Sequence, residues 1–210
     1  MKLLLISLFA LLQPNADDFK LQNGDLIFQE ACSGDVATAI KDVTKSSDGN
    51  QFTHVGIVYI DENENVFVLE ATHPKVTLTP LNEYLYPQEY KDYYPKSVVG
   101  RLKNEYQYCI PKALKEGMNL IGKDYDYGYI LNNDQYYCSE LVYDILLKAN
   151  NGLPVFPLNV MTFKSSETGE FTKEWIDYFD RLDVPVPEGE MGINPGAMSR
   201  SDVLSIIHYY

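Results

Sequence analysis

The stretch YYCSELVY, residues 136–143, sets a cysteine directly in front of a run of residues with helical spacing. Apolar residues continue at that spacing as far as residue 149, and residues 150–152 read as the stop signal of a helix. A cysteine at a helix start lies near unpaired backbone N–H groups and the positive end of the helix dipole, which favour the thiolate. Two interpretations of Cys138 follow: a reactive nucleophile, or a small buried residue that packs as a hydrophobe.

The chain before and after this segment predicts a mixed α and β domain without repeats or linkers. From residue 153 onward we expect a C-terminal extension that packs on the domain, with helical patterns at residues 171–182 and 199–207. The segments before it are predicted as a strand over 24–30, a helix over 34–44, a hairpin of strands 54–60 and 65–71, and helices over 109–121 and 139–150.

The N-terminal segment has the layout of a secretory signal peptide. It contains one lysine, an apolar run over residues 3–12 and then a polar stretch. The apolar run is too short to span a bilayer. We therefore expect residues 1–16 to direct export to the periplasm or the extracellular space, with the cleavage position open and no stable membrane insertion after cleavage. Residues 17–210 are then one domain, whose extension begins at about residue 153.

Charge and cysteine content limit the function classes. The 17 basic and 30 acidic residues give a net charge of -13, which argues against a nucleic-acid partner. The same field is expected to favour neutral or cationic substrates over strongly anionic ones. The three cysteines, Cys32, Cys109 and Cys138, are too few for a disulfide framework, and their odd number leaves at least one thiol unpaired in the monomer.

The predicted hairpin brings a histidine and a carboxylate together. If the turn is centred near Glu62, His54 lies opposite Glu70, and a shift of the turn by one residue places Thr72 opposite instead. Taken alone, a strand-edge histidine and a strand-end glutamate are ordinary structural residues. Together with Cys138, however, they are the parts needed for a nucleophile, its base and a residue that orients the base.

Other candidate residues carry weaker signals. Asp25 and Gln29 read more readily as turn and strand residues than as site residues. His73 precedes a proline and is expected in a loop. No histidine pair at i, i+4, Cys-x-x-Cys motif or phosphate loop is present, so neither a metal nor a cofactor is predicted. The segment at residues 81–96 contains five tyrosines and is interpreted either as a substrate rim or as surface packing.

Four segments in a fixed order resemble a known family. GDLIFQ (24–29), THVGIVY (53–59), VLEA (68–71) and YDYGYILNNDQYYCSELVY (125–143) are similar to the circularly permuted branch of the NlpC-type papain-like hydrolases, the YiiX/YebB-like group. In unpermuted papain-like enzymes the cysteine helix precedes the histidine strand, whereas here His54 precedes Cys138. The resemblance covers roughly residues 24–150. It implies an α+β, circularly permuted papain-like fold in which an antiparallel sheet packs against the helix that carries the cysteine.

The resemblance also implies roles for individual residues. Cys138 would be the nucleophile, His54 the general base and Glu70 the orienting third residue. Tyr125 is similar to a tyrosine that lies near the cysteine in related enzymes, so it is a candidate oxyanion donor. Other tyrosines compete for that role, and the backbone N–H of Cys138 could also supply it. These competing tyrosines are Tyr127, Tyr136 and Tyr137.

The expected function is cleavage of an amide bond by a cysteine hydrolase through a thioester. The substrate would be a cell-wall peptide, another small peptide or an N-acyl compound. Two alternatives remain: an acyltransferase or lipid-directed thioesterase of the lecithin retinol acyltransferase-like type, and a non-catalytic protein that binds a ligand on the same fold. The sequence does not separate acceptors, because water, amines and alcohols all resolve the same thioester. It also leaves the oligomeric state open.

Overall fold

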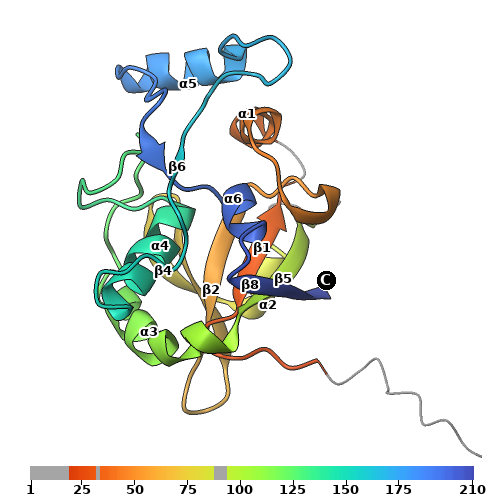
Figure 1. The fold of residues 1–210 in the computed structure, drawn as a ribbon, viewed down its shortest axis with the longest axis vertical. Coiled ribbons are helices and arrows are strands. Elements are labelled where there is room, and N and C mark those ends of the chain that lie inside the picture. Colours follow the sequence, from red (N-terminus) through yellow and green to blue (C-terminus); the bar gives the residue numbers. More distant parts are fainter. Residues whose placement is uncertain (1–18, 32–33, 88–93) are drawn as a thin grey trace, which may run out of the picture.

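A six-stranded antiparallel sheet forms the centre of the molecule in the computed structural model, with strand order β4-β3-β2-β1-β5-β8 (Figure 1). The structure describes residues 19–31, 34–87 and 94–210, so the predicted signal peptide and Cys32 lie outside the described residues. The sheet strands are β1 (Leu26–Glu30), β2 (His54–Ile60), β3 (Val66–Thr72), β4 (Lys75–Pro80), β5 (Lys96–Leu102) and β8 (Leu204–Tyr209).

The two faces of the sheet bury different side chains because successive residues of a strand point to opposite faces. In β2, Val55 and Ile57 join the main core, which also contains buried residues of α3 (Ile110–Met118) and α4 (Cys138–Ala149). Val58 of the same strand joins a second cluster with the short helix α2 (Leu81–Leu85). The helix that begins at Cys138 therefore packs against the larger of the two hydrophobic clusters.

Two of the remaining helices pack together outside the sheet. Helix α1 (Asp35–Val43) packs against α5 (Lys173–Leu182), and the indole N–H of Trp175 donates to the carbonyl of Ala39 at 3.2 Å (Figure 1). The other elements are β6 (Asn159–Val160), which pairs with β7 (Met191–Gly192), helix α6 (Pro195–Ser199) and the 3-10 helix η1 (Ser47–Gly49). The 3-10 helix η3 (Asn104–Cys109) lies apart from these, next to β5 and α3.

The structure confirms the helices and strands predicted before residue 150 and the helix at residues 171–182. The helix predicted at residues 199–207 is wrong. Helix α6 ends at Ser199, and Leu204–Tyr209 forms β8, which pairs with β5. Exposure alternates along β8, and its β-branched Ile206 and Ile207 suit a strand. The C-terminal extension therefore adds the edge strand of the sheet and does not merely cover one side.

The hairpin register also differs from the expected one. Ile57 pairs with Leu69 and Ile60 pairs with Val66, so the turn lies one residue further along than predicted. If this register is continued, His54 lies opposite Thr72, and the predicted direct pairing of His54 with Glu70 is wrong. Glu70 is instead the diagonal neighbour of His54, still within reach of a long side chain.

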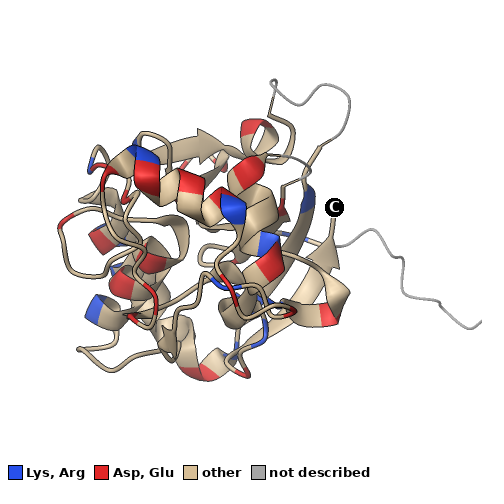
Figure 2. Cartoon of the chain, turned by 90° about the horizontal axis from the view of Figure 1, so that it is seen from above, with Lys and Arg blue, Asp and Glu red and all other residues tan. Residues whose placement is uncertain are grey.

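Acidic and basic positions are interspersed over the described residues (Figure 2). Figure 2 shows Asp and Glu positions scattered over helices and loops, in keeping with the net charge of -13. Among the described residues, no helix is both long and apolar enough to cross a membrane.

Candidate active site

Glu70 on β3 lies between His54 on β2 and Thr79 on β4. The Nε2 atom of His54 lies 2.5 Å from Oε2 of Glu70, and the Thr79 hydroxyl donates to Oε1 of Glu70 at 2.5 Å. The contact expected between His54 and Glu70 is therefore present, although it is diagonal. The structure gives Thr72, the alternative third residue, no hydrogen bond to His54. Since both carboxylate oxygens have partners, Glu70 is fixed in the orientation that holds the imidazole.

Gly56 makes room for this contact. A Cβ atom on Gly56 would lie 2.3 Å from Cγ1 of Val68 and 3.3 Å from Cβ of Glu70. The first distance is far shorter than van der Waals contact, so any other residue here would push β3 away. The glycine two residues after the histidine thus lets Glu70 approach His54.

Cys138 is the first residue of α4, and its side chain is buried next to His54. Burial by itself lowers the pKa of His54, but hydrogen bonds to Cys138 and Glu70 and the charges of both groups outweigh burial and raise the pKa to about 10. His54 is then an imidazolium at neutral pH. Because its Nε2 atom faces Glu70, Nδ1 is the ring nitrogen that remains for the Cys138 sulfur.

Tyr84 of α2 covers the imidazole from one side. The ring centroids of His54 and Tyr84 lie 5.8 Å apart, and the Tyr84 hydroxyl donates to the carbonyl of Ile27 at 2.8 Å. Tyr84 belongs to the tyrosine-rich segment, but it is buried in the second hydrophobic cluster, so it is part of neither a substrate rim nor a surface loop. Tyr86 and Tyr94 of the same segment are exposed and meet edge to face.

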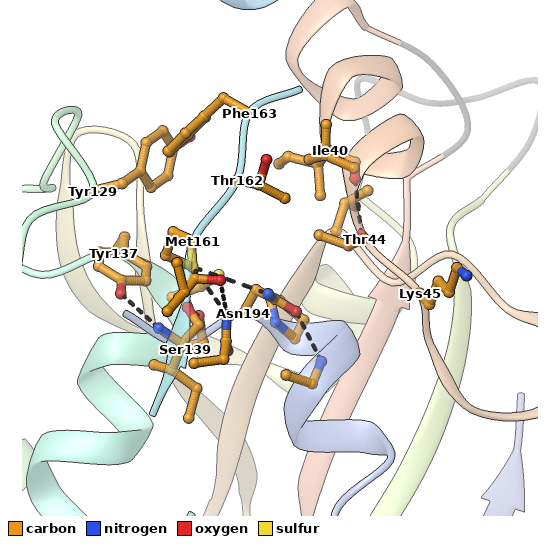
Figure 3. Close-up of a pocket in the computed structure, with 18 of the residues that line it drawn as sticks. Ile40, Thr44, Lys45, Tyr129, Tyr137, Ser139, Met161, Thr162, Phe163 and Asn194 are labelled. Carbon is orange, nitrogen blue, oxygen red and sulfur yellow. Dashed lines mark hydrogen bonds between the residues drawn. The ribbon is translucent and has the colours of Figure 1, made fainter. Parts of the chain in front are cut away.

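Beside Cys138 lies a cavity of about 370 Å³. Its walls come from the start of α4, from α1 and from residues of the C-terminal extension, and Cys138 is among the lining residues. In Figure 3 the labelled Ile40 of α1 lies on one side, and the labelled Tyr129 and Phe163 lie on the other. The site therefore combines a thiol, an imidazolium and a space that could hold part of a substrate.

Tyr125 and Tyr137 both line this cavity, whereas the competing Tyr127 and Tyr136 do not. The Tyr137 hydroxyl accepts a hydrogen bond from the backbone N–H of Ile193 at 3.2 Å. Tyr125 stacks on His73, with ring centroids 4.2 Å apart. Burial raises the pKa of both phenols, so each stays neutral and able to donate a hydrogen bond. The structure thus leaves two tyrosines near the thiol.

Comparison with known proteins shows the family of this chain. Residues 20–208 match the family described as permuted papain-like amidase enzyme, YaeF/YiiX, C92 family. The chain belongs to this family of amidases. It is 32% identical over 148 residues to an uncharacterised protein YiiX of Escherichia coli strain K12, over 70% of this chain and 67% of that protein.

A solved structure shares the fold of this C92-family chain. It is a crystal structure described as metalloprotein yiiX from Escherichia coli O157:H7, with a TM-score of 0.72 and 23% identity, covering 91% of this chain and 99% of the other. The likeness confirms the α+β, permuted papain-like fold, with its antiparallel sheet and its cysteine helix. In the part of this chain that the structure describes, no group of three or more His, Cys, Asp or Glu side chains is arranged to hold a metal ion.

The C92-family chain uses its other polar candidates for structure. Asp25 accepts hydrogen bonds from Arg101 at 2.7 and 2.8 Å, and the Gln29 amide donates to the Tyr84 carbonyl and the Ser97 hydroxyl. The structural interpretation of both residues is therefore confirmed. His73 lies in the turn between β3 and β4, as expected for a loop residue before proline.

A buried carboxylate in the first turn of α4 was not recognised in the sequence. Glu140, two residues after Cys138, is 4% exposed and accepts hydrogen bonds from the backbone N–H groups of Asn132 and Tyr137. Burial and the charge of Asp126 raise the pKa of Glu140 to about 8. Thr79 was also missed, although the alternation of Val76 and Leu78 with Thr77 and Thr79 is a signal for a strand beside β3.

Proposed function

We propose that this amidase cleaves its substrate through a thioester on Cys138, with His54 as acid and base and Glu70 as the residue that orients His54. One observation carries the proposal: His54 contacts both Cys138 and Glu70, and its pKa is raised to about 10. A thiolate next to an imidazolium is the form of a cysteine nucleophile that is ready to attack at neutral pH.

The reaction would proceed in two balanced steps. In the first, the Cys138 sulfur attacks the amide carbonyl carbon, the C–N bond breaks, and the His54 imidazolium gives its proton to the leaving nitrogen. In the second, the now neutral His54 takes a proton from water, and the resulting hydroxide attacks the thioester carbon. The C–S bond breaks, which returns the thiolate and the imidazolium.

The negative oxygen of each tetrahedral intermediate needs hydrogen-bond donors. The backbone N–H of Cys138 lies in the first turn of α4, where N–H groups have no partner within the helix. Tyr125 or Tyr137 could add a phenolic donor from the same cavity. An amine or alcohol in place of water would convert the second step into acyl transfer, so we propose hydrolysis as the main reaction and acyl transfer as its variant.

Selective alkylation of Cys138 tests the nucleophile. We expect iodoacetamide to modify Cys138 well before Cys109 near neutral pH, because Cys109 is fully buried in the core and Cys138 faces the cavity. Peptide mass spectrometry after timed quenching would give the two rates and that of Cys32. Replacing His54 with alanine should slow the labelling of Cys138 alone. Equal, slow labelling of all three thiols would remove the nucleophile from the proposal and favour a non-catalytic binding protein.

We also propose that the protein acts outside the cytoplasm, on the basis of the signal-like segment at residues 1–16. Expression of the full chain in a bacterial host should give a periplasmic or secreted product whose intact mass lacks an N-terminal segment. A variant without residues 2–16 should stay in the cytoplasm at full mass. Retention of the uncleaved full chain in the cytoplasm would contradict export.

A further inference from the structure

We propose that the cavity beside Cys138 binds the acyl part of the substrate, and that this part is an uncharged, apolar group of modest size. The inference rests on the proposed function and deepens it, since it selects N-acyl compounds over cell-wall peptides with charged side chains. It is carried by the position of the cavity relative to His54, by the chemistry of its walls and by its volume.

The position of the cavity decides which half of the substrate enters it. Cys138 and Ser139 line the cavity, but His54 does not. His54 must reach the leaving nitrogen in order to protonate it, so the amine half lies on the His54 side of the sulfur. The half that remains bound to sulfur as a thioester then points away from His54. The cavity, lined by Cys138 and Ser139 but not by His54, is the space that we assign to this half.

The walls of the cavity suit an apolar group. Apolar side chains come from α1 and from the C-terminal extension, among them Ile40, Val43, Met161, Phe163, Trp175 and Ile193. No Asp or Glu is among the lining residues, although the whole chain carries a net charge of -13.

The charged residues at the edge of the cavity offer no partner for a cationic group. The two basic lining residues, Lys45 and Arg200, are exposed to solvent. In Figure 3 the labelled Lys45 side chain points away from the other labelled residues. A lysine side chain of a substrate would find no carboxylate here and would lose hydration on entering. The negative net charge of the chain therefore influences which substrates approach, whereas the lining of the cavity determines which acyl group can bind.

The volume sets the size of this group. At about 370 Å³ the cavity is near the lower end of the range for small-molecule sites, so it would hold one acyl chain or one aromatic acid rather than a folded chain. The C-terminal extension supplies Met161, Phe163 and Ile193 to the walls, which gives it a role in specificity in addition to its strand in the sheet.

A series of alkyl chloromethyl ketones tests the inference without requiring turnover. In these reagents the alkyl group occupies the position of the acyl chain, and the Cys138 thiolate displaces chloride, so that a C–S bond forms as the C–Cl bond breaks. We expect the second-order rate of alkylation to rise about fourfold per added methylene until the cavity is full. An ammonium group at the end of the chain should lower the rate relative to the uncharged reagent of equal length.

Matched tryptophan substitutions locate the effect. Ile40→Trp narrows the cavity and should abolish the preference for long chains. Ile176→Trp is the control, since Ile176 is exposed on α5 and does not line the cavity. Met161→Ala enlarges the cavity and should move the best chain to a greater length, which keeps the test open if Ile40→Trp fails to fold.

Hydrolysis of matched N-acyl p-nitroanilides separates this inference from the proposed function. Alkylation rates independent of chain length, or faster alkylation by the cationic reagent, would overturn the apolar acyl site even if Cys138-dependent hydrolysis is present. A chain-length preference that Ile40→Trp removes would support the acyl site. If no anilide were then hydrolysed in a Cys138-dependent manner, the proposed amide hydrolysis would be contradicted, whereas the proposed acyl site would still stand.

Discussion

Replacement of Cys138 with alanine is expected to reduce amide hydrolysis by about four orders of magnitude or more, with little change in thermal stability. The loss follows from the role of the sulfur as the bond-forming atom, because removal of a nucleophile leaves only binding and oxyanion stabilisation. The substitution deletes one atom at the wall of an existing cavity, so the core should tolerate it. Single-turnover hydrolysis and thermal unfolding of the same preparation would measure both effects.

Cys109→Ala provides the matched control for this prediction. Cys109 is buried at the end of η3 and lies in the same hydrophobic core cluster, but it does not line the cavity. This variant should keep nearly full activity at some cost in stability, the opposite of the result for Cys138. Substantial hydrolysis by Cys138→Ala would mean that another group attacks the amide, and the thioester mechanism would be wrong.

Local patterns in the sequence were sufficient for the elements that carry the site. The helix after Cys138 follows from apolar spacing, and β2 and β3 follow from runs of β-branched and apolar residues. The pairing register of β2 with β3 could not be predicted from the sequence, because the hydrophobic pattern of the hairpin is compatible with either of two turn positions one residue apart. The contact between His54 and Glu70 nonetheless forms, because a glutamate side chain is long enough to reach a diagonal neighbour.

The parts of the site that depend on distant segments were not predicted. Thr79 lies on β4, a six-residue strand with the sequence KVTLTP that was not among the predicted elements. The cavity needs Ile40 and residues after 153 to meet, and no local pattern encodes that packing. β8 was mistaken for a helix because Asp202 and the serines before it resemble a helix cap, while pairing with β5 decides the conformation.

Glu70→Gln should slow hydrolysis by a factor on the order of 10² to 10⁴ and should narrow the pH range of activity from the alkaline side. Hydrogen bonds and charges of Cys138 and Glu70 hold the pKa of His54 at about 10, above its usual 6.5. Glutamine removes the negative charge of Glu70, so the pKa of His54 should fall. The imidazolium that protonates the leaving amine is then lost at a lower pH. Measurement of kcat/KM between pH 5 and 11 would locate this limb in both proteins.

The same shift has a consequence for stability that does not depend on turnover. A histidine with a raised folded-state pKa stabilises the fold fully below about pH 6.5, and that contribution is lost as the pH rises toward about 10. The free energy of unfolding of the wild type should therefore fall across this interval, and it should fall less in Glu70→Gln. Thr79→Val should act in the same direction with a smaller effect, since it removes a hydrogen bond to Glu70 but leaves the charge.

Thr72→Val is the matched comparison for these variants, because Thr72 is opposite His54 in the continued register but forms no hydrogen bond with it in the structure. It should keep the wild-type alkaline limb, whereas Thr79→Val should lower it. A full loss of activity in Thr72→Val together with an unchanged profile in Glu70→Gln would assign the orienting role to Thr72. Cys138 alone would then raise the pKa of His54. The pH dependence of kcat/KM in these variants therefore distinguishes Glu70 from Thr72 as the orienting residue.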